Sequence, residues 1–212
     1  MKILLFGATG TIADSVFKVV KKNSKKLSVV AATCNTNYVK LEKVKNEYGI
    51  KKIGINNCKA ATKYQNTYGR NKNLIIGNDN FSELITKDVD VIILAISGLS
   101  PLNISYDIVK SGKIIGLANK ECIISLGSRL LQLAKRHKTR IVPLDSEHNS
   151  IYRLLESNKN ALKSITITAS GGPFFRKKKN LNNVTPKEAT KHPVWKMGKK
   201  ISVDSATMMN KA

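Results

Sequence analysis

A short apolar run that ends in a glycine-rich turn constrains the fold of this chain more than any other feature. Residues 2–6, KILLF, have the pattern of a buried strand, and the turn GATGTIA follows at 7–13. The next residues, 12–20, have helical spacing. A strand, a glycine turn and a helix in this order are typical of the first unit of a parallel α/β sheet.

The alternation of strand and helix continues to about residue 145. Further strands are predicted at 27–33, 89–96, 113–118 and 140–144, with weaker candidates at 52–55 and 73–76. Further helices are predicted at 101–110 and 121–136. Because strands that alternate with helices form parallel sheets covered on both faces, we predict an α/β fold, a Rossmann-like doubly wound parallel sheet.

The pattern changes after residue 145. A helix is predicted at 146–156, an alternating strand, KSITITA, at 163–169, and a capped helix start, TPKEAT, at 185–190. We therefore predict a domain boundary near residue 145, followed by the start of an α+β domain. Hydrophobic residues make up 42% of the 212 residues, which suffices for a sizeable core.

The formal net charge of +23 comes mostly from lysine. Two interpretations fit this excess: a polyanion partner such as nucleic acid, or lysines spread over solvated faces. The lysines are dispersed along the chain and aromatic residues make up only 6%, so few rings are available to stack on bases. We favour the second interpretation and expect no nucleic-acid partner.

The apolar runs also bear on location. None approaches the ~20 residues that a membrane-spanning helix needs, and the N-terminal run is too short for a signal peptide. We expect no membrane association and a cytoplasmic protein. Cys34, Cys58 and Cys122 are scattered, without the spacing of a metal site or a disulfide framework.

The glycine turn predicts a dinucleotide site, because Gly10 lets backbone N–H groups approach a pyrophosphate at the helix N-terminus. A purely structural turn is the alternative. After the second strand, residues 35–37 and Lys40 stand where NAD-binding sites place an acid for the ribose hydroxyls. These residues favour NADP, unless they only cap the next helix.

Polar side chains also follow two later strands. Asn119, Lys120 and Glu121 follow one, where a cation and an amide suit an anionic substrate, and an ordinary helix cap is the alternative. Asp145 and Glu147 follow the other, and their carboxylates suit a hard cation such as Mg²⁺ or Mn²⁺. Two carboxylates are few for such an ion, and a capped helix start is the alternative here.

A last group of polar residues lies near the end of the chain. The serine–glycine turn at 170–172 and the polar side chains of 205–211 offer hydroxyl, amide and ammonium donors to a phosphate. HPVWKMG at 192–198 has an apolar cover suited to a lid. Taken alone, its histidine and tryptophan are more often packing residues.

Taken together, the motifs GATGTIA, LANKE, LDSEHN, ASGGPF and HPVWKMGKKISVDSATMMNK resemble, in order and spacing, those of the 1-deoxy-D-xylulose 5-phosphate reductoisomerase family. The resemblance implies an NADPH-dependent enzyme that uses Mg²⁺ or Mn²⁺. Its reaction converts 1-deoxy-D-xylulose 5-phosphate to 2-C-methyl-D-erythritol 4-phosphate in isoprenoid precursor biosynthesis. It also implies a homodimer when full length, and a plastid-type organelle as the location if the source is eukaryotic.

The resemblance assigns roles residue by residue. It implies an NADPH-binding domain at 1–145 and an incomplete catalytic domain at 146–212, with a flap at about 173–198. Cofactor contacts are implied for Thr9, Gly10, Thr11, Ile12, Asn37, Gly98, Asn119 and Glu121. Asp145 and Glu147 are the implied metal ligands, and the implied catalytic set adds Lys120 and His192. Substrate contacts are implied for Lys120, Ser146, Ser170, His192, Trp195, Ser205, Asn210 and Lys211.

Two departures from the family pattern matter. The family often has Gly-Lys before Asn37, where this chain has Asn35 and Thr36, so the strength of the preference for NADPH over NADH stays open. The family motif continues beyond Lys211 to a third metal carboxylate, and this chain stops at Ala212. We therefore expect a fragment with little or no turnover. Two alternatives stay open: a cofactor-binding module without catalysis, and a basic nucleic-acid-binding protein.

Overall fold

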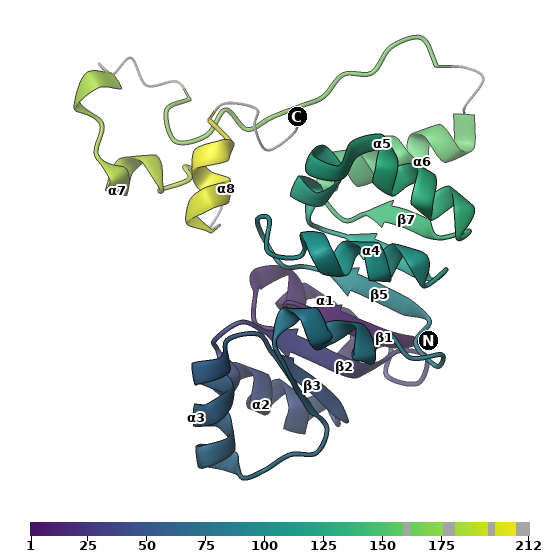
Figure 1. Cartoon of the computed structure of the whole chain (residues 1–212). Helices are drawn as coiled ribbons and strands as arrows, with labels where there is room; N and C mark the ends of the chain where they lie inside the picture. The colour runs from purple at the N-terminus through teal and green to yellow at the C-terminus, as the bar shows by residue number, and fades with distance from the viewer. Residues whose placement is uncertain (159–161, 176–180, 195–197, 207–212) are drawn as a thin grey trace. The chain divides into compact units, whose positions relative to one another are not determined.

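The computed structural model describes residues 1–158, 162–175, 181–194 and 198–206 (Figure 1). The chain divides into two compact units, Met1–Asp145 and Ser146–Ala212. In the described ranges, no helix combines the length and the apolar character that crossing a membrane requires.

The first unit is built on seven strands, which coincide with the apolar runs of the sequence. They are β1 (Lys2–Phe6), β2 (Ser28–Cys34), β3 (Lys52–Ile55), β4 (Leu74–Ile76), β5 (Val91–Leu94), β6 (Ile114–Leu117) and β7 (Arg140–Pro143). All neighbours pair in parallel, in the order β4-β3-β2-β1-β5-β6-β7. The chain winds one way from β1 to β4 and the other way from β5 to β7. The predicted Rossmann-like, doubly wound sheet is therefore confirmed, including its two weaker strands.

Helices cover both faces of this sheet. They are α1 (Thr11–Lys22), α2 (Tyr38–Tyr48), α3 (Cys58–Tyr68), the 3₁₀ helix η1 (Asn78–Leu84), α4 (Leu102–Lys110) and α5 (Lys120–Arg136). Alternate residues of β1 divide the core into two layers. Ile3 and Leu5 pack with buried residues of α1, α2 and α3, whereas Leu4 and Phe6 pack with those of η1, α4 and α5. Because residues 3–6 are all buried, β1 reads as an unbroken apolar run.

The second unit contains shorter elements. They are α6 (Ser146–Asn158), the 3₁₀ turn η3 (Leu181–Asn183), α7 (Pro186–Ala189) and α8 (Lys199–Asp204). Helix α7 begins as its sequence predicts, with Thr185 and Glu188 forming a capping box and Pro186 at the first helical position.

The strand predicted at 163–169 is wrong. These residues are all exposed, and the described residues include no strand that pairs with them. An alternating β-branched run indicates a strand only when a neighbour supplies backbone hydrogen bonds, and that neighbour is not encoded locally.

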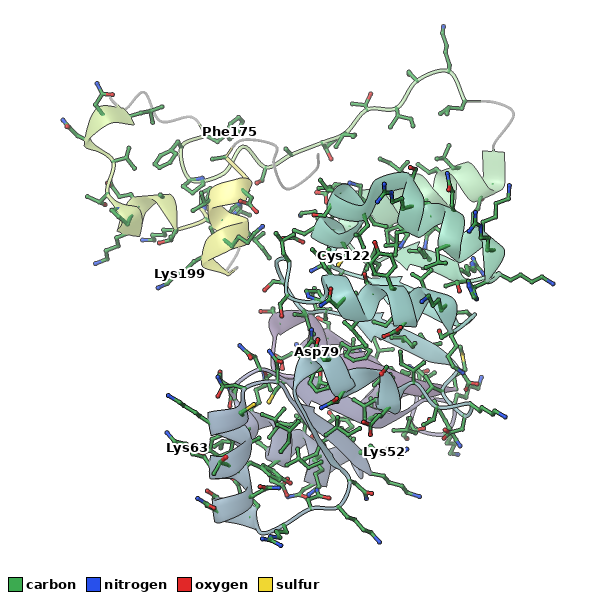
Figure 2. The ribbon with its side chains drawn as sticks, in the orientation of Figure 1. Lys52, Lys63, Asp79, Cys122, Phe175 and Lys199 are labelled. Atoms are coloured by element: carbon green, nitrogen blue, oxygen red, sulfur yellow. The ribbon has the colours of Figure 1, made fainter. Side chains whose placement is uncertain are left out.

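The excess positive charge is spread over both faces of the first unit. Lys21 of α1 and Lys63 of α3 are exposed on one side of the sheet, and Lys110 of α4 and Lys135 of α5 are exposed on the other. Figure 2 shows Lys63 on the outer side of α3. This distribution favours solvated lysines over a single nucleic-acid face.

Candidate active site

The glycine turn lies directly after β1, where the order of strands reverses between β1 and β5. Gly7 has φ +87°, and a Cβ on it would lie 2.6 Å from the carbonyl oxygen of Ala95. Both the backbone conformation and the contact with the end of β5 therefore require glycine. Ligands of doubly wound sheets bind outside the carboxyl ends of the strands at this reversal.

The turn is held from β2 by Thr33, whose side chain is fully buried. The N–H of Gly7 donates to Oγ1 of Thr33 at 3.2 Å, and the N–H of Ala8 donates to its carbonyl at 2.7 Å. Sequence reasoning missed this residue. The available signal was a lone hydroxyl inside an apolar strand, which must find a partner when it is buried.

Gly10 differs from Gly7 because the fold does not require it to be glycine. It caps the N-terminus of α1 with φ −91° and ψ 174°, and an added Cβ would meet only Gly7 O, at an ordinary 3.7 Å. In the part of the chain that the structure describes, no side chain caps this helix end. Helix α1 therefore begins with N–H groups that no side chain covers, and Thr11 and Ile12 beside them are exposed.

The residues after β2 serve partly as helix caps. Oδ1 of Asn37 accepts a hydrogen bond from the N–H of Lys40 at 3.0 Å, which caps α2. Oδ1 of Asn35 accepts from Nδ2 of Asn56 at 3.1 Å, which links the ends of β2 and β3. Nζ of Lys40 reaches the glycine turn, 3.3 Å from the carbonyl oxygen of Thr9 and 2.7 Å from Oδ1 of Asp14.

Asn119, at the N-terminus of α5, is buried and uses both ends of its amide. Nδ2 donates to the carbonyl oxygens of Ile96 and Gly98 at 2.6 and 2.7 Å, and Oδ1 accepts from the N–H of Cys122 at 2.8 Å. One side chain therefore caps α5 and fixes the loop after β5. Gly98 in that loop has φ +75°, which favours glycine.

Lys120 and Asp145 lie at the carboxyl ends of the neighbouring strands β6 and β7. Their Nζ and Oδ2 atoms are 3.8 Å apart, and about a fifth of each side chain is exposed. The helix dipole disfavours a lysine in the first turn of a helix, and the nearby carboxylate of Asp145 offsets this effect. Glu121, the next residue, is half-buried and has the charge that this helix end favours.

Two thiols in this unit are unsuited to nucleophilic chemistry. Burial raises the pKa of Cys34, at the end of β2, to about 12. Burial likewise raises the pKa of Cys122, in the first turn of α5, to about 11. Both groups therefore stay protonated at neutral pH and act as small core residues.

In the second unit, Ser146 and Glu147 begin α6. Oγ of Ser146 donates to Oε2 of Glu147 at 2.7 Å. Oxygen atoms of this kind suit a hard cation. In the described parts of the chain, no three His, Cys, Asp or Glu side chains gather closely enough to hold a metal by themselves.

Ser170 and His192 form a hydrogen-bonded pair in the second unit. Nε2 of the buried His192 lies 2.9 Å from Oγ of Ser170, and the N–H of Val194 donates to Nδ1 at 3.2 Å. Because Nδ1 accepts, the neutral ring carries its proton on Nε2 and donates it to Ser170. The hydroxyl hydrogen of Ser170 is then available to an acceptor such as a phosphate oxygen.

The serine–glycine turn also contacts the end of α8. Gly172 has φ +68°, and a Cβ there would lie 2.5 Å from the backbone nitrogen of Ala206 and 2.8 Å from the carbonyl carbon of Ser205. Ser205 is buried, and its hydroxyl donates to the carbonyl oxygen of Ser202 at 2.7 Å. The second unit thus gathers Ser170, His192 and Ser205. The predicted contacts Trp195, Asn210 and Lys211 lie outside the described residues.

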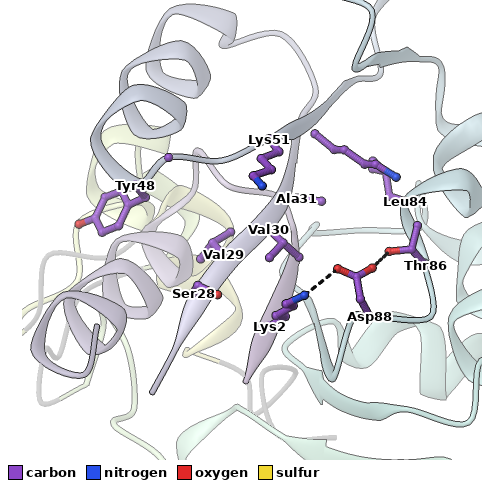
Figure 3. A pocket seen from close by; sticks show the side chains of 12 residues that line it. Lys2, Ser28, Val29, Val30, Ala31, Tyr48, Lys51, Leu84, Thr86 and Asp88 are labelled. Atoms are coloured by element: carbon purple, nitrogen blue, oxygen red, sulfur yellow. Dashed lines mark hydrogen bonds and ion pairs between the residues drawn. The ribbon is translucent and has the colours of Figure 1, made fainter. Parts of the chain in front are cut away.

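A cavity of about 330 Å³ lies at the opposite ends of the strands from the glycine turn (Figure 3). It is lined by residues that begin β1, β2 and β3, among them Lys2, Ser28 and Lys52. Nζ of Lys2 pairs with Oδ2 of Asp88 at 3.3 Å beside it. Because these are the amino ends of the strands, this cavity is not the dinucleotide site that the topology predicts.

Two family models match this chain. The model described as 1-deoxy-D-xylulose 5-phosphate reductoisomerase matches residues 3–127. The model described as the C-terminal domain of the same enzyme matches residues 141–212.

Curated relatives carry the same name. The 1-deoxy-D-xylulose 5-phosphate reductoisomerase of Caldanaerobacter subterraneus subsp. tengcongensis is 36% identical over 212 residues, which cover 99% of this chain and 56% of the relative. That of Pelagibacter ubique is 40% identical over 215 residues, which cover 99% of this chain and 55% of the relative. The chain thus spans little more than half the length of these relatives.

Solved structures of such enzymes share the fold. A DOX-P reductoisomerase in complex with NADPH, fosmidomycin and magnesium matches with a TM-score of 0.87 and 32% identity, covering 100% of this chain and 55% of that one. The enzyme from Zymomonas mobilis in complex with NADPH matches with a TM-score of 0.85 and 33% identity, covering 99% of this chain and 55% of that one. On these matches of sequence and fold, the chain belongs to the 1-deoxy-D-xylulose 5-phosphate reductoisomerase family.

Proposed function

We propose that this chain supplies the NADPH-binding and phosphate-binding parts of an enzyme that converts 1-deoxy-D-xylulose 5-phosphate to 2-C-methyl-D-erythritol 4-phosphate. The observation that carries the proposal is Gly10, a glycine at an open helix N-terminus where the fold itself has no need of glycine. Such a position suits close approach of a pyrophosphate. The NADPH in two solved relatives supports the same cofactor here.

The first unit, residues 1–145, is the proposed NADPH domain. The turn residues Thr9, Gly10, Thr11 and Ile12 would contact the pyrophosphate through backbone N–H groups. Asn37 would lie at the adenosine end, and Gly98 and Glu121 would lie at the nicotinamide end. Because Asn119 is buried and its amide is occupied, we assign it the role of positioning Gly98.

The second unit, residues 146–212, is the proposed start of the catalytic domain, with a flap at about 173–198. Ser170 and Ser205 would donate hydroxyl groups to the substrate phosphate, joined by Asn210 and Lys211. His192 orients the hydroxyl of Ser170, and with Trp195 it belongs to the flap that would exclude water from the site. Phosphate contacts of this kind position a substrate through a group that does not react.

The divalent cation is the remaining component. Asp145 and Glu147 supply carboxylate oxygens, the donors that Mg²⁺ and Mn²⁺ prefer, so the residues fit the ion. Substrate oxygens would complete its ligands. When bound, the ion supplies a Lewis acid for the carbonyl and hydroxyl oxygens of the substrate. Ser146, which lies between these carboxylates in the sequence, and Lys120, whose Nζ is 3.8 Å from Oδ2 of Asp145, would bind the same polar end of the substrate.

A homodimer of the full-length protein stays a prediction of the family resemblance, and a cytoplasmic location stays a prediction from the apolar runs of the sequence. Light scattering on the full-length protein tests the first.

A binding titration with two matched glycine variants tests the proposed cofactor site. Gly10→Val fills the space at the start of α1, and Gly198→Val makes the same change at another glycine N-cap with extended backbone and, among the described residues, no neighbour within 4 Å. We expect Gly10→Val to weaken NADPH binding by at least about tenfold, because side-chain atoms would occupy the path of the pyrophosphate. Gly198→Val should leave it unchanged. Equal NADPH affinity in all three proteins would refute the proposed site.

A further inference from the structure

We propose that Lys40 sets the preference for NADPH over NADH by supplying the cation for the 2′-phosphate. The inference rests on the proposed function, because it concerns the same dinucleotide site. It concerns a residue outside the motif that the family resemblance assigned to this end of the cofactor, where Asn35 and Thr36 precede Asn37.

Lys40 is placed between the two parts of a dinucleotide site. It lies in the first turn of α2, which follows β2, and its ammonium reaches back to the glycine turn after β1. In doubly wound sheets, the pyrophosphate lies at the first turn and the adenosine ribose lies at the end of the second strand. The ammonium of Lys40 lies between these two places, so it is within reach of a phosphate on that ribose.

The neighbouring residues leave this task to Lys40. The segment 35–40, NTNYVK, contains no other cation and no acid that could select the 2′-hydroxyl of NADH. Oδ1 of Asn35 accepts from Asn56 and Oδ1 of Asn37 accepts from the backbone of α2, and the Nδ2 groups of these amides are donors without charge. Within residues 35–40, the ammonium of Lys40 has the positive charge that a phosphate dianion requires.

The ion pair with Asp14 holds this ammonium in place without trapping it. Nζ lies 2.7 Å from Oδ1 of Asp14, with 32% of the lysine side chain and 50% of the aspartate side chain exposed. Ion pairs open to solvent contribute little free energy, so a phosphate with two charges can compete with one carboxylate. Asp14 thus keeps the ammonium at the turn until the phosphate arrives.

Three variants test the assignment through the dissociation constants of NADPH and NADH, measured on the same chain at one ionic strength. We expect Lys40→Met to weaken NADPH binding by about tenfold, as loss of a charge-assisted hydrogen bond does, and to change NADH binding by less than about twofold. Lys40→Arg should keep the preference because it keeps the charge. Lys43→Met, on an exposed residue of the same helix, is the control and should change neither constant.

The ratio of the dissociation constants of NADPH and NADH distinguishes binding of the 2′-phosphate from other roles of Lys40. If Lys40→Met weakens both nucleotides equally, the ammonium only supports the turn and the assignment is wrong. If it changes neither, another group binds the phosphate and the assignment is also wrong. If the proposed dinucleotide site is itself wrong, the observed result is different, because Gly10→Val would then not affect the binding of either nucleotide.

Discussion

The two units of this chain hold their candidate site residues by different means. In the first unit, strands buried on both faces end in residues such as Gly7, and buried side chains such as Thr33 and Asn119 hold the loops. In the second unit, Ser170 and Ser205 lie in a turn and at the end of a short helix. Its buried residues, as far as the structure describes them, are Gly172, Pro173, His192, Ser202 and Ser205, of which none has a large apolar side chain.

This contrast indicates how each unit responds to change. The first has an apolar core on both faces of its sheet, and opening the turns that Thr33 and Asn119 hold would break hydrogen bonds of buried side chains. The second depends on a few polar contacts and on one close backbone approach at Gly172. We therefore expect the first unit to bear the stability of the chain and the second to open locally.

Gly7→Val should have the largest effect on the first unit. The valine would have to adopt φ +87° and place its Cβ 2.6 Å from the carbonyl oxygen of Ala95. Strain and overlap of this kind cost at least about 3 kcal/mol of the free energy of unfolding. Urea denaturation followed by circular dichroism measures the loss. A variant as stable as the original would contradict the account of the turn.

Asn119→Ala should have the next largest effect and should lower the free energy of unfolding by about 3 kcal/mol. It removes the cap of α5 and leaves the carbonyl oxygens of Ile96 and Gly98 without their buried donor. Asn37→Ala is the matched control, because it removes only an exposed cap of α2 and should cost about 1 kcal/mol. Equal losses from the two variants in the same denaturation experiment would show that the loop after β5 is not held through Asn119.

Thr33→Val should lower the free energy of unfolding by less, about 1–2 kcal/mol. It keeps the shape of the side chain and removes the acceptor for the N–H of Gly7. Because this hydrogen bond orients the turn, NADPH affinity should fall along with the free energy of unfolding. A loss of stability with unchanged NADPH affinity would confine Thr33 to the core.

Gly172→Ala should have the smallest effect on the first unit. The added Cβ would overlap the backbone of Ser205 and Ala206, so the second unit should lose protection from hydrogen exchange across the turn and α8. The first unit should keep its protection, and its buried thiols Cys34 and Cys122 should stay unreactive to a thiol reagent. Loss of protection in both units would show that they do not behave as separate units.

The sequence predicts the strands and the glycine turn well because both signals are local. An apolar run identifies β1, and Gly7 identifies its turn, without knowledge of the rest of the chain. The role of Thr33 cannot be predicted from a local signal, because it depends on the pairing of β2 with β1. The strand predicted at 163–169 fails for the related reason that its partner would have to come from elsewhere.

The polar site residues show a second limit of sequence reasoning. The sequence singles out Asn119 as a substrate contact or a helix cap, and the fold adds that its amide reaches the loop after β5. Lys40 is likewise one of several polar residues after β2 until its contacts with Thr9 and Asp14 are known. Residue type predicts which groups can act, and tertiary contacts decide which of them do.

Amide chemical shifts recorded while NADPH is added to the chain test the central claim most directly. We predict that the largest shifts fall on residues 9–12 and on Lys40, at the carboxyl ends of β1 and β2. Residues that line the cavity at the amino ends, such as Ser28 and Lys52, should not move. Shifts confined to those amino-end residues, or no shifts at saturating NADPH, would contradict the account.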